Sequence, residues 1–448
     1  MTQNATKLPN RWAIAISGVI VMICLGTVYS WSIFTQPLLA SFGWSNSTTT
    51  TAFELAIFFL GVGAVIGGRL QDRMNPRTIT IAGVVMWGVG NLLAGLGTPS
   101  LGAPWLYLTY GVLGGLGLGF GYISPVSMVT KWFPDKRGLA SGMVVMGFGL
   151  ATIIYNSIVK GIPSFAAAAR KASAYADAKA TAVKNGTTFD PTQYTMAPAD
   201  VHAIMMIFII SGIVFLIIGG IASIILRNPP AGYTVPGAVA AAALGGRNYG
   251  PGEILKMPQF YLLWLMLFLN VTAGILIISN AVPIMRDLTG ATAGVAAGAY
   301  GLVAIFNGLG RFFWGAVSDR IGRNYAYVLI YGIQVVIFLI LGGLHTVTLT
   351  ALAFAVVLLC YGGGFGTMPS FNADYFGTKF MGVNYGMILT AWGFGGVVGP
   401  SIAAAVKDAT GGFSKALVPV AIMLLVAAIL PFITRKPTEQ PAAVTAAT

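Results

Sequence analysis

One arginine in the second half of the chain lies where a positive charge is costly. Arg311 follows the apolar stretch 301–306 and precedes three aromatic residues. A charge within a membrane-spanning helix costs about 2.5–3.5 kcal/mol on insertion scales, so such a residue indicates a function. Its guanidinium can bind a carboxylate through two parallel hydrogen bonds, and Asn307, one helical turn earlier, could donate an amide hydrogen bond to the same group. The alternative is that Arg311 snorkels towards the adjacent loop.

An acidic residue near the start of the second apolar run could carry a proton. Glu54 is the one charged residue of the segment 51–56. A carboxyl group in apolar surroundings can take up and release a proton in a useful pH range, so Glu54 is the candidate for proton coupling. The alternative is a solvated acid at the external end of a helix.

A short loop pattern occurs twice, once in each half of the chain. In both copies a glycine is followed four residues on by an Asp-Arg pair and then by another arginine. The first copy comprises Gly68, Asp72, Arg73 and Arg77, and the second comprises Gly315, Asp319, Arg320 and Arg323. Glycine lets two helices approach closely, and the charged residues can pair with each other or with a helix end. We predict that these loops form a gate; the alternative is that they are ordinary loop charges that set membrane topology.

Twelve apolar runs must position these residues. Hydrophobic residues make up 56% of the chain and charged residues only 8%, whereas a soluble domain carries about 25% charged residues. Each run approaches the roughly 20 residues that cross a bilayer. The runs cover 12–36, 48–68, 78–98, 103–129, 138–160, 203–226, 257–282, 292–316, 325–344, 347–370, 381–406 and 414–434. The sequence therefore predicts an all-α polytopic membrane protein with twelve transmembrane helices in two pseudo-symmetric six-helix bundles.

Soluble stretches divide the chain into an N-terminal bundle, a linker, a C-terminal bundle and a tail. An Ala-rich stretch with scattered charges between the fifth and sixth runs predicts an external helix and loop. The predicted parts are the bundle 1–226 with its external insert at about 161–200, the cytoplasmic linker 227–256, the bundle 257–434 and the cytoplasmic tail 435–448.

The basic residues behind the net charge of +13 are placed as membrane topology requires rather than as a nucleic-acid-binding surface. Lysines and arginines cluster in short loops between apolar runs, which is the positive-inside pattern, and we exclude nucleic acid as a partner. The pattern predicts that both termini are cytoplasmic. The only cysteines, Cys24 and Cys360, lie inside apolar runs and indicate neither a disulfide framework nor a metal cluster. We predict no cofactor and no metal.

The repeated loop resembles the signature of the major facilitator superfamily. The segment from Lys131 to Gly142, between the fourth and fifth runs, is similar to the corresponding loop of the oxalate/formate antiporter family, bacterial relatives of monocarboxylate transporters. So are Asn10-Arg11-Trp12, Tyr29-Ser30-Trp31, the segment from Asn307 to Gly315, and Asn384-Tyr385-Gly386. The resemblance implies that Arg311 binds the substrate carboxylate. It also implies a pocket lined by aromatic residues at Tyr29, Tyr122, Tyr361 and Phe365.

The sequence departs from this family at one position of the eleventh run. The oxalate/formate exchanger carries a lysine there that joins the arginine in binding a dicarboxylate, and this chain has Trp392. No lysine or arginine occurs between Lys379 and Lys407. One cation suits one carboxylate, and a dianion would bring an unmatched charge into a dry site. We therefore expect a monocarboxylate substrate that also contacts Trp392.

These observations predict a secondary active transporter of small carboxylate anions that works by alternating access. The leading prediction is a proton-coupled carrier of a monocarboxylate such as lactate, pyruvate, formate or acetate. Oxalate/formate-type exchange and a non-transporting carboxylate sensor are the alternatives. Zinc, nucleophile-elbow and phosphate-loop motifs are absent from the sequence, so we predict no enzyme and no ATP drive. The expected partners are the anion, a proton and the lipid bilayer, and the expected form is a monomer in a bacterial inner membrane.

Overall fold

The computed structural model describes residues 9–190, 196–230, 232–235, 247–410 and 414–437. Within these ranges the chain is built of helices and connecting turns, and no strand occurs in them. Parts of the predicted linker 227–256, of the insert at about 161–200 and of the tail 435–448 lie outside the described residues.

Ten described helices are long and apolar enough to cross a membrane. One of them, Pro76–Trp132, has 57 residues and would be about 85 Å long if straight, far more than a bilayer's thickness. It is broken at Gly102, whose φ of 71° and ψ of −159° suit only glycine, and it therefore makes two crossings. The shorter apolar helix Leu417–Ile433 adds a further crossing. The described residues thus contain the twelve spans that the sequence predicts.

The first half supplies six spans and one helix outside them. Two π-helical stretches and one 3-10 stretch continue neighbouring α-helices, so the first, fourth and sixth spans each consist of more than one element. The elements are α1 (Arg11–Gly26), η1 (Thr27–Trp31), α2 (Ser32–Phe42), α3 (Asn46–Gln71), α4 (Pro76–Leu106), η2 (Tyr107–Gly114), α5 (Gly115–Trp132), α6 (Arg137–Lys160), α7 (Pro163–Asn185), α8 (Pro198–Val214), η4 (Phe215–Gly219) and α9 (Gly220–Ile225).

The second half repeats this plan. Threonine side chains cap two of its helices, because Thr292 accepts a hydrogen bond from the Val295 amide and Thr346 accepts one from the Leu349 amide. The elements are α10 (Pro251–Ile254), α11 (Pro258–Thr289), α12 (Ala293–Val303), α13 (Ile305–Ile321), α14 (Arg323–Leu341), α15 (Val347–Phe376), α16 (Met381–Thr410), η6 (Ser414–Ala416), α17 (Leu417–Ala427) and α18 (Leu430–Ile433).

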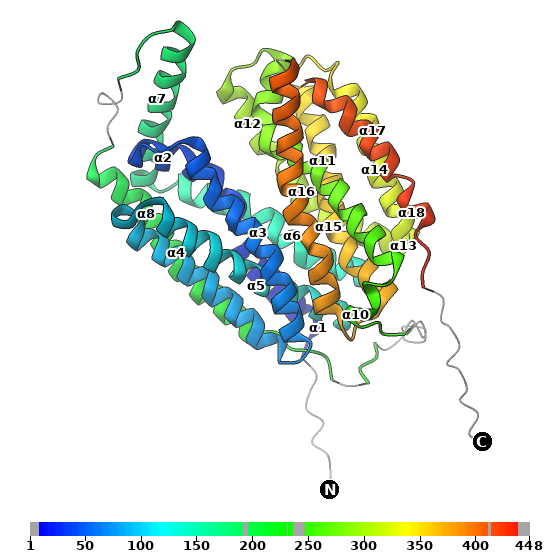
Figure 1. The fold of residues 1–448 in the computed structure, drawn as a ribbon. Coiled ribbons are helices and arrows are strands. Elements are labelled where there is room, and N and C mark those ends of the chain that lie inside the picture. The colour runs from blue at the N-terminus through cyan, green and yellow to red at the C-terminus, as the bar shows by residue number, and fades with distance from the viewer. Residues whose placement is uncertain (1–8, 191–195, 231, 236–246, 411–413, 438–448) are drawn as a thin grey trace, which may run out of the picture.

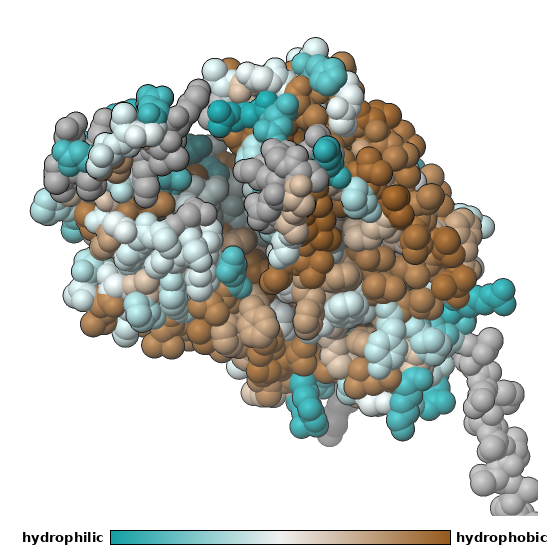
Figure 2. All heavy atoms as spheres, turned by 45° about the horizontal axis from the view of Figure 1, so that its top comes forward, coloured by the Kyte–Doolittle hydropathy of each residue, from teal (hydrophilic) through white to brown (hydrophobic). Residues whose placement is uncertain are grey.

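The two halves lie side by side, meet at one end and diverge at the other (Figure 1). We call the end at which the described chain begins and ends the closed end and the other the open end. At the closed end a Cβ on Gly68 would strike the Gly382 carbonyl oxygen, and one on Gly315 would strike that of Gly138. Figure 2, viewed towards the open end, shows a hollow between the two lobes.

Candidate functional site

Arg311 lies in the middle of α13, and glycines on two neighbouring helices determine its position. A Cβ on Gly142 of α6, or on Gly366 of α15, would strike the Arg311 carbonyl oxygen. Gly362 of α15 approaches the carbonyl oxygen of Asn307 in the same way. Small residues allow such close backbone contact in membranes, so α13 is clamped between α6 of the first half and α15 of the second.

The guanidinium of Arg311 is buried and only weakly bonded. The residue is 0% exposed, so it does not snorkel towards the loop. Its Nε donates to Asn307 Oδ1 at 3.4 Å and its Nη1 to the Val145 carbonyl at 3.5 Å, both long bonds. Its Nη2 makes no well-formed hydrogen bond, and Arg311 makes no ion pair with any described residue. An unsatisfied buried donor costs about 1–3 kcal/mol and more when charged, so the site favours an anion.

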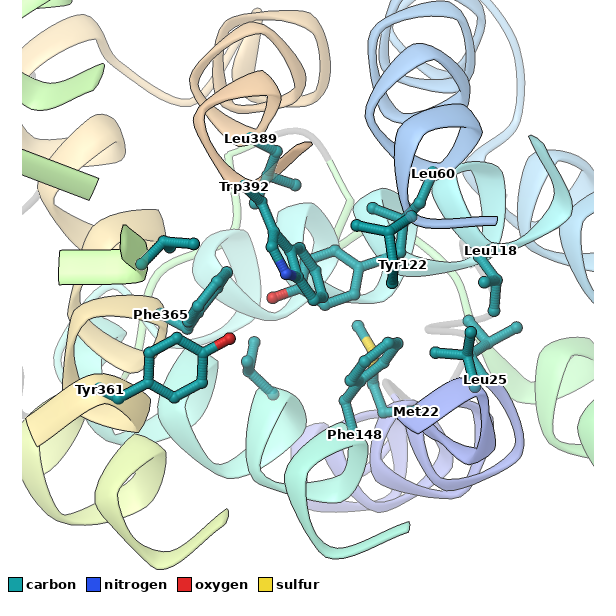
Figure 3. Packing of buried hydrophobic residues seen from close by; sticks show 14 of the residues in the cluster. Met22, Leu25, Leu60, Leu118, Tyr122, Phe148, Tyr361, Phe365, Leu389 and Trp392 are labelled. Carbon is teal, nitrogen blue, oxygen red and sulfur yellow. The ribbon is translucent and has the colours of Figure 1, made fainter. Parts of the chain in front are cut away.

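Six aromatic residues from both halves surround this cation, and we call them the aromatic cluster. The guanidinium carbon lies 4.9 Å from the ring centre of Phe365 and 5.7 Å from that of Phe148. The rings of Phe365 and Trp392 are 4.7 Å apart, and Figure 3 shows rings from both halves facing one another. The cluster consists of Tyr29, Tyr122, Phe148, Tyr361, Phe365 and Trp392.

Two tyrosines of the cluster meet across the boundary between the halves. The hydroxyls of Tyr29 and Tyr361 are 3.3 Å apart. On α15, which runs towards the closed end, Tyr361 stands four residues before Phe365, hence about 6 Å nearer to the open end. This pair therefore lies on the side of the Arg311 site that faces the open end.

The structure brings together most of the site residues predicted from the sequence. Arg311, Tyr29, Tyr122, Tyr361, Phe365 and Trp392 lie in one group, with Asn307 beside it. Asn307 accepts a bond from Arg311, so its amide orients the guanidinium, and its contact with substrate stays a prediction. Glu54 lies apart: its side chain is exposed on α3 rather than buried in apolar surroundings. The described structure therefore gives Glu54 no place in the Arg311 site.

Sequence reasoning missed two sets of residues. Phe148 of α6 was not predicted, although Gly142 and Gly149, seven residues apart, mark the face of α6 that meets α13. The second set supports the cluster from behind: Asn270 donates to the Tyr361 carbonyl and Gln334 donates to Asn270, each at 3.0 Å. These two lie on separate spans, α11 and α14, and no spacing in the sequence connects them.

At the closed end, Asp319 of α13 binds the first turn of α6 in the other half. Its two carboxylate oxygens accept from the Gly138 and Leu139 amides, both at 2.8 Å. Arg323 pairs with Asp319 at 2.8 Å and with Asp374 at 2.9 Å. A carboxylate is stabilised at a helix N-terminus by free N–H groups and the helix dipole, so this contact joins the halves electrostatically.

Asp72 makes the equivalent contact in the other direction. It accepts from the amides of Gly382 and Val383, in the first turn of α16, at 3.3 and 3.0 Å. Burial raises the pKa of Asp72 above its ordinary value of 3.8, although the bonds from Val383 and Gly382 and the nearby Lys131 oppose that shift. The two contacts are thus related by the internal repeat, and the Asp72 contact has the longer bonds.

Not every predicted gate residue lies between the halves. Gly68, Asp72, Gly315, Asp319 and Arg323 do. Arg77 instead donates to the Leu226 carbonyl within the first half, and Arg73 and Arg320 are exposed. Their participation in a gate remains a prediction without a contact to support it.

We expect Asp319→Asn to shift the protein away from the closed-end contact, and Asp72→Asn to do so less. The amide removes the charge that binds a helix N-terminus, and a hydrogen bond to a charged group contributes about 1.5–3 kcal/mol, so the ratio of the two states should change roughly 10-fold for Asp319→Asn. Labelling of single engineered cysteines at each end measures this, because Cys24 and Cys360 are buried. Unchanged labelling in both variants would show that these loops only set topology.

Comparisons with known proteins agree with the motifs. A family model described as Major Facilitator Superfamily matches residues 16–167 and 199–400. An oxalate:formate antiporter from Oxalobacter formigenes is 29% identical over 90% of this chain and 87% of its own length. Apicoplast pyruvate carrier 1 from Toxoplasma gondii is 25% identical over 86% and 82%. Human monocarboxylate transporter 7 is 24% identical over 36% of this chain and 33% of its own length.

Solved structures show the same fold. The major facilitator transporter FucP in its outward conformation has a TM-score of 0.68 at 16% identity, over 94% of this chain and 99% of that one. A double tryptophan mutant of XylE has a TM-score of 0.66 at 13% identity, over 96% and 97%. The predicted resemblance and fold class are thereby confirmed. With twelve spans in two halves and a family model that matches most of its length, this chain belongs to the Major Facilitator Superfamily of membrane transporters.

Proposed function

We propose that this chain carries a small monocarboxylate anion across a bacterial inner membrane. The observation that carries the proposal is Arg311, a fully buried charge between the two halves that has no acidic partner among the described residues and whose Nη2 makes no well-formed hydrogen bond. A bound carboxylate would accept hydrogen bonds from this guanidinium and neutralise it in a dry site. The aromatic cluster would enclose the rest of the anion.

The charge of the site supports one carboxylate rather than two. Trp392 occupies the position that faces Phe365 and Tyr122, and neither lysine nor arginine occurs between Lys379 and Lys407. Similarity to a pyruvate carrier and to a monocarboxylate transporter agrees with this reading. Oxalate/formate-type exchange is the second candidate, favoured by the similarity to an oxalate:formate antiporter.

The arrangement of the halves supports alternating access. The basic loops lie at the closed end, and by the positive-inside rule that end, with both termini, would be cytoplasmic. The open end would then face outwards, and the substrate would reach Arg311 by parting Tyr29 and Tyr361. Release of the Asp319 and Asp72 contacts would open the opposite side.

A proton is the proposed coupling ion. The sequence makes Glu54 the candidate proton carrier. Because Glu54 is exposed on α3, it would take up and release protons outside the Arg311 site. Exchange of two anions without a proton is the alternative. A pH gradient across liposomes separates the two, because only coupled transport would accumulate the anion faster than protein-free liposomes do when the gradient is the sole driving force.

Counterflow in liposomes tests the proposal directly. Purified protein is reconstituted with unlabelled pyruvate, lactate, formate, acetate or oxalate inside, and uptake of the labelled anion is measured. We expect uptake of at least one monocarboxylate well above that of protein-free liposomes. A protein that exchanges none of these anions would refute the proposal.

A further inference from the structure

The aromatic cluster contains a second unpartnered donor besides Arg311. The indole N–H of Trp392 is buried and has no hydrogen-bond acceptor among the described residues. A tryptophan N–H can only donate, so it needs an acceptor that the protein does not supply. The Trp392 ring lies 4.7 Å from that of Phe365, which lies 4.9 Å from the Arg311 guanidinium carbon. Trp392 and Arg311 are therefore both neighbours of the Phe365 ring.

Tyr122 adds a hydroxyl beside this indole. Its side chain is fully buried and its ring lies 5.8 Å from that of Trp392. Its hydroxyl has the Tyr385 hydroxyl as a neighbour but makes no well-formed hydrogen bond. Figure 3 shows the Trp392 indole nitrogen and the Tyr122 hydroxyl directed towards the middle of the cluster. The two groups come from different halves of the chain, α16 and α5, as do Arg311 and Phe148. A ligand that bonds both would bridge the halves.

The acceptor that these groups require is neutral and close to the carboxylate. Both donors are uncharged, and none of the described residues places a second cation against the cluster, so a second carboxylate would be left without a counter-charge. Arg311 and Trp392 both border the Phe365 ring, so the acceptor and the carboxylate bound by Arg311 would lie in the same cluster. An oxygen on the carbon next to a carboxylate satisfies both conditions.

We infer that Trp392 and Tyr122 form a second subsite, which binds the 2-oxo or 2-hydroxy oxygen of a short monocarboxylic acid held by Arg311. This inference rests on the proposed function, since it takes Arg311 as the carboxylate anchor. It assigns the substrate to the 2-oxo and 2-hydroxy acids and makes Trp392 a specificity-determining residue. An unsubstituted acid of the same length leaves the indole N–H unpaired and is bound less well.

Binding measured by calorimetry on the purified full-length protein tests this at neutral pH, with pyruvate, lactate and propionate as monoanionic probes. We expect the wild type to bind pyruvate and lactate roughly 10-fold more tightly than propionate, because each makes one more hydrogen bond in a dry site. Trp392→Phe removes the N–H and keeps an aromatic ring. It should weaken pyruvate and lactate binding more than propionate binding, so that the preference falls towards unity.

Trp314→Phe is the matched control. Trp314 is a buried tryptophan of α13 that packs against Ala326, Ile330 and Cys360, outside the aromatic cluster. Trp314→Phe should keep the wild-type preference for pyruvate and lactate over propionate. Tyr122→Phe is a second test, because it removes only a hydroxyl. It should also reduce the preference for pyruvate and lactate over propionate. The inference can therefore still be refuted if Trp392→Phe does not fold.

Two results would overturn the inference. One is a wild type that binds all three anions equally, and the other is a preference that survives both Trp392→Phe and Tyr122→Phe. Either result leaves the proposed function intact as long as propionate still binds in an Arg311-dependent manner. If no carboxylate binds at all, the proposed function itself is refuted. The failure of the proposed function can therefore be told apart from the failure of this inference.

Discussion

Arg311→Lys should abolish most carrier-mediated uptake while leaving the protein folded. The lysine keeps the positive charge, but a compact ammonium cannot reproduce the planar fork that holds a carboxylate through two bonds. It would also lose the contacts of the guanidinium with Asn307 and with the Phe365 ring. Losing one charge-assisted hydrogen bond costs about 1.5–3 kcal/mol, so we expect apparent affinity and uptake together to fall about 100-fold.

Counterflow of the best wild-type substrate measures this effect, and a melting curve of the purified variant reports folding. Arg320→Lys is the matched control, because Arg320 lies on the same helix but is exposed at the closed end. It should transport at the wild-type rate. Wild-type uptake and affinity in Arg311→Lys would remove Arg311 as the carboxylate anchor and with it the basis of the proposed function.

Trp392→Lys should improve oxalate binding relative to lactate and pyruvate. The wild-type site offers one cation, so a dianion leaves one buried charge unpaired at a cost of several kcal/mol. Trp392 is 0% exposed and contacts Phe365, Tyr122 and Tyr29, so a lysine there would extend into the aromatic cluster. We expect the ratio of oxalate affinity to pyruvate affinity to rise at least 10-fold, since each 1.4 kcal/mol changes an equilibrium constant 10-fold.

Competition of unlabelled oxalate against labelled pyruvate measures the ratio. Gly393→Lys is the control, because the next residue on α16 points about 100° away and a Cβ on Gly393 meets no atom within 4 Å. This variant should leave the ratio near that of the wild type. A wild-type protein that binds oxalate more tightly than any monocarboxylate would refute the charge argument itself, whatever Trp392→Lys does.

Several features could be predicted from residue types alone. The number of spans follows from the length of apolar runs, because lipid leaves the backbone no hydrogen-bonding partner outside the helix. Arg311 could be selected as the proposed carboxylate anchor because a charge in such a run is costly unless it has a function. The relationship between the two gate loops is visible in the sequence as a repeat, since Asp72 and Asp319 follow their glycines at the same spacing.

Other features required the tertiary structure. Nothing in the sequence shows that Asp319 binds the first turn of α6, or that Arg323 also pairs with Asp374, because these contacts join helices far apart in the chain. Glu54 was chosen for its apolar neighbours in sequence, yet its side chain is exposed. The local sequence shows which residues are neighbours along a helix, whereas burial depends on which face of that helix packs against another span.

The sequence by itself therefore determined the membrane-spanning helices and their number, and it singled out Arg311 as the cation proposed to bind a carboxylate. Only the tertiary structure decided what surrounds that cation. Phe148 and Phe365 come from different helices, and they meet at Arg311 because glycines such as Gly142 and Gly366 let α6, α13 and α15 approach backbone to backbone. Helix formation in a membrane depends on local backbone hydrogen bonds, but a binding site depends on contacts between distant segments, which no local pattern specifies.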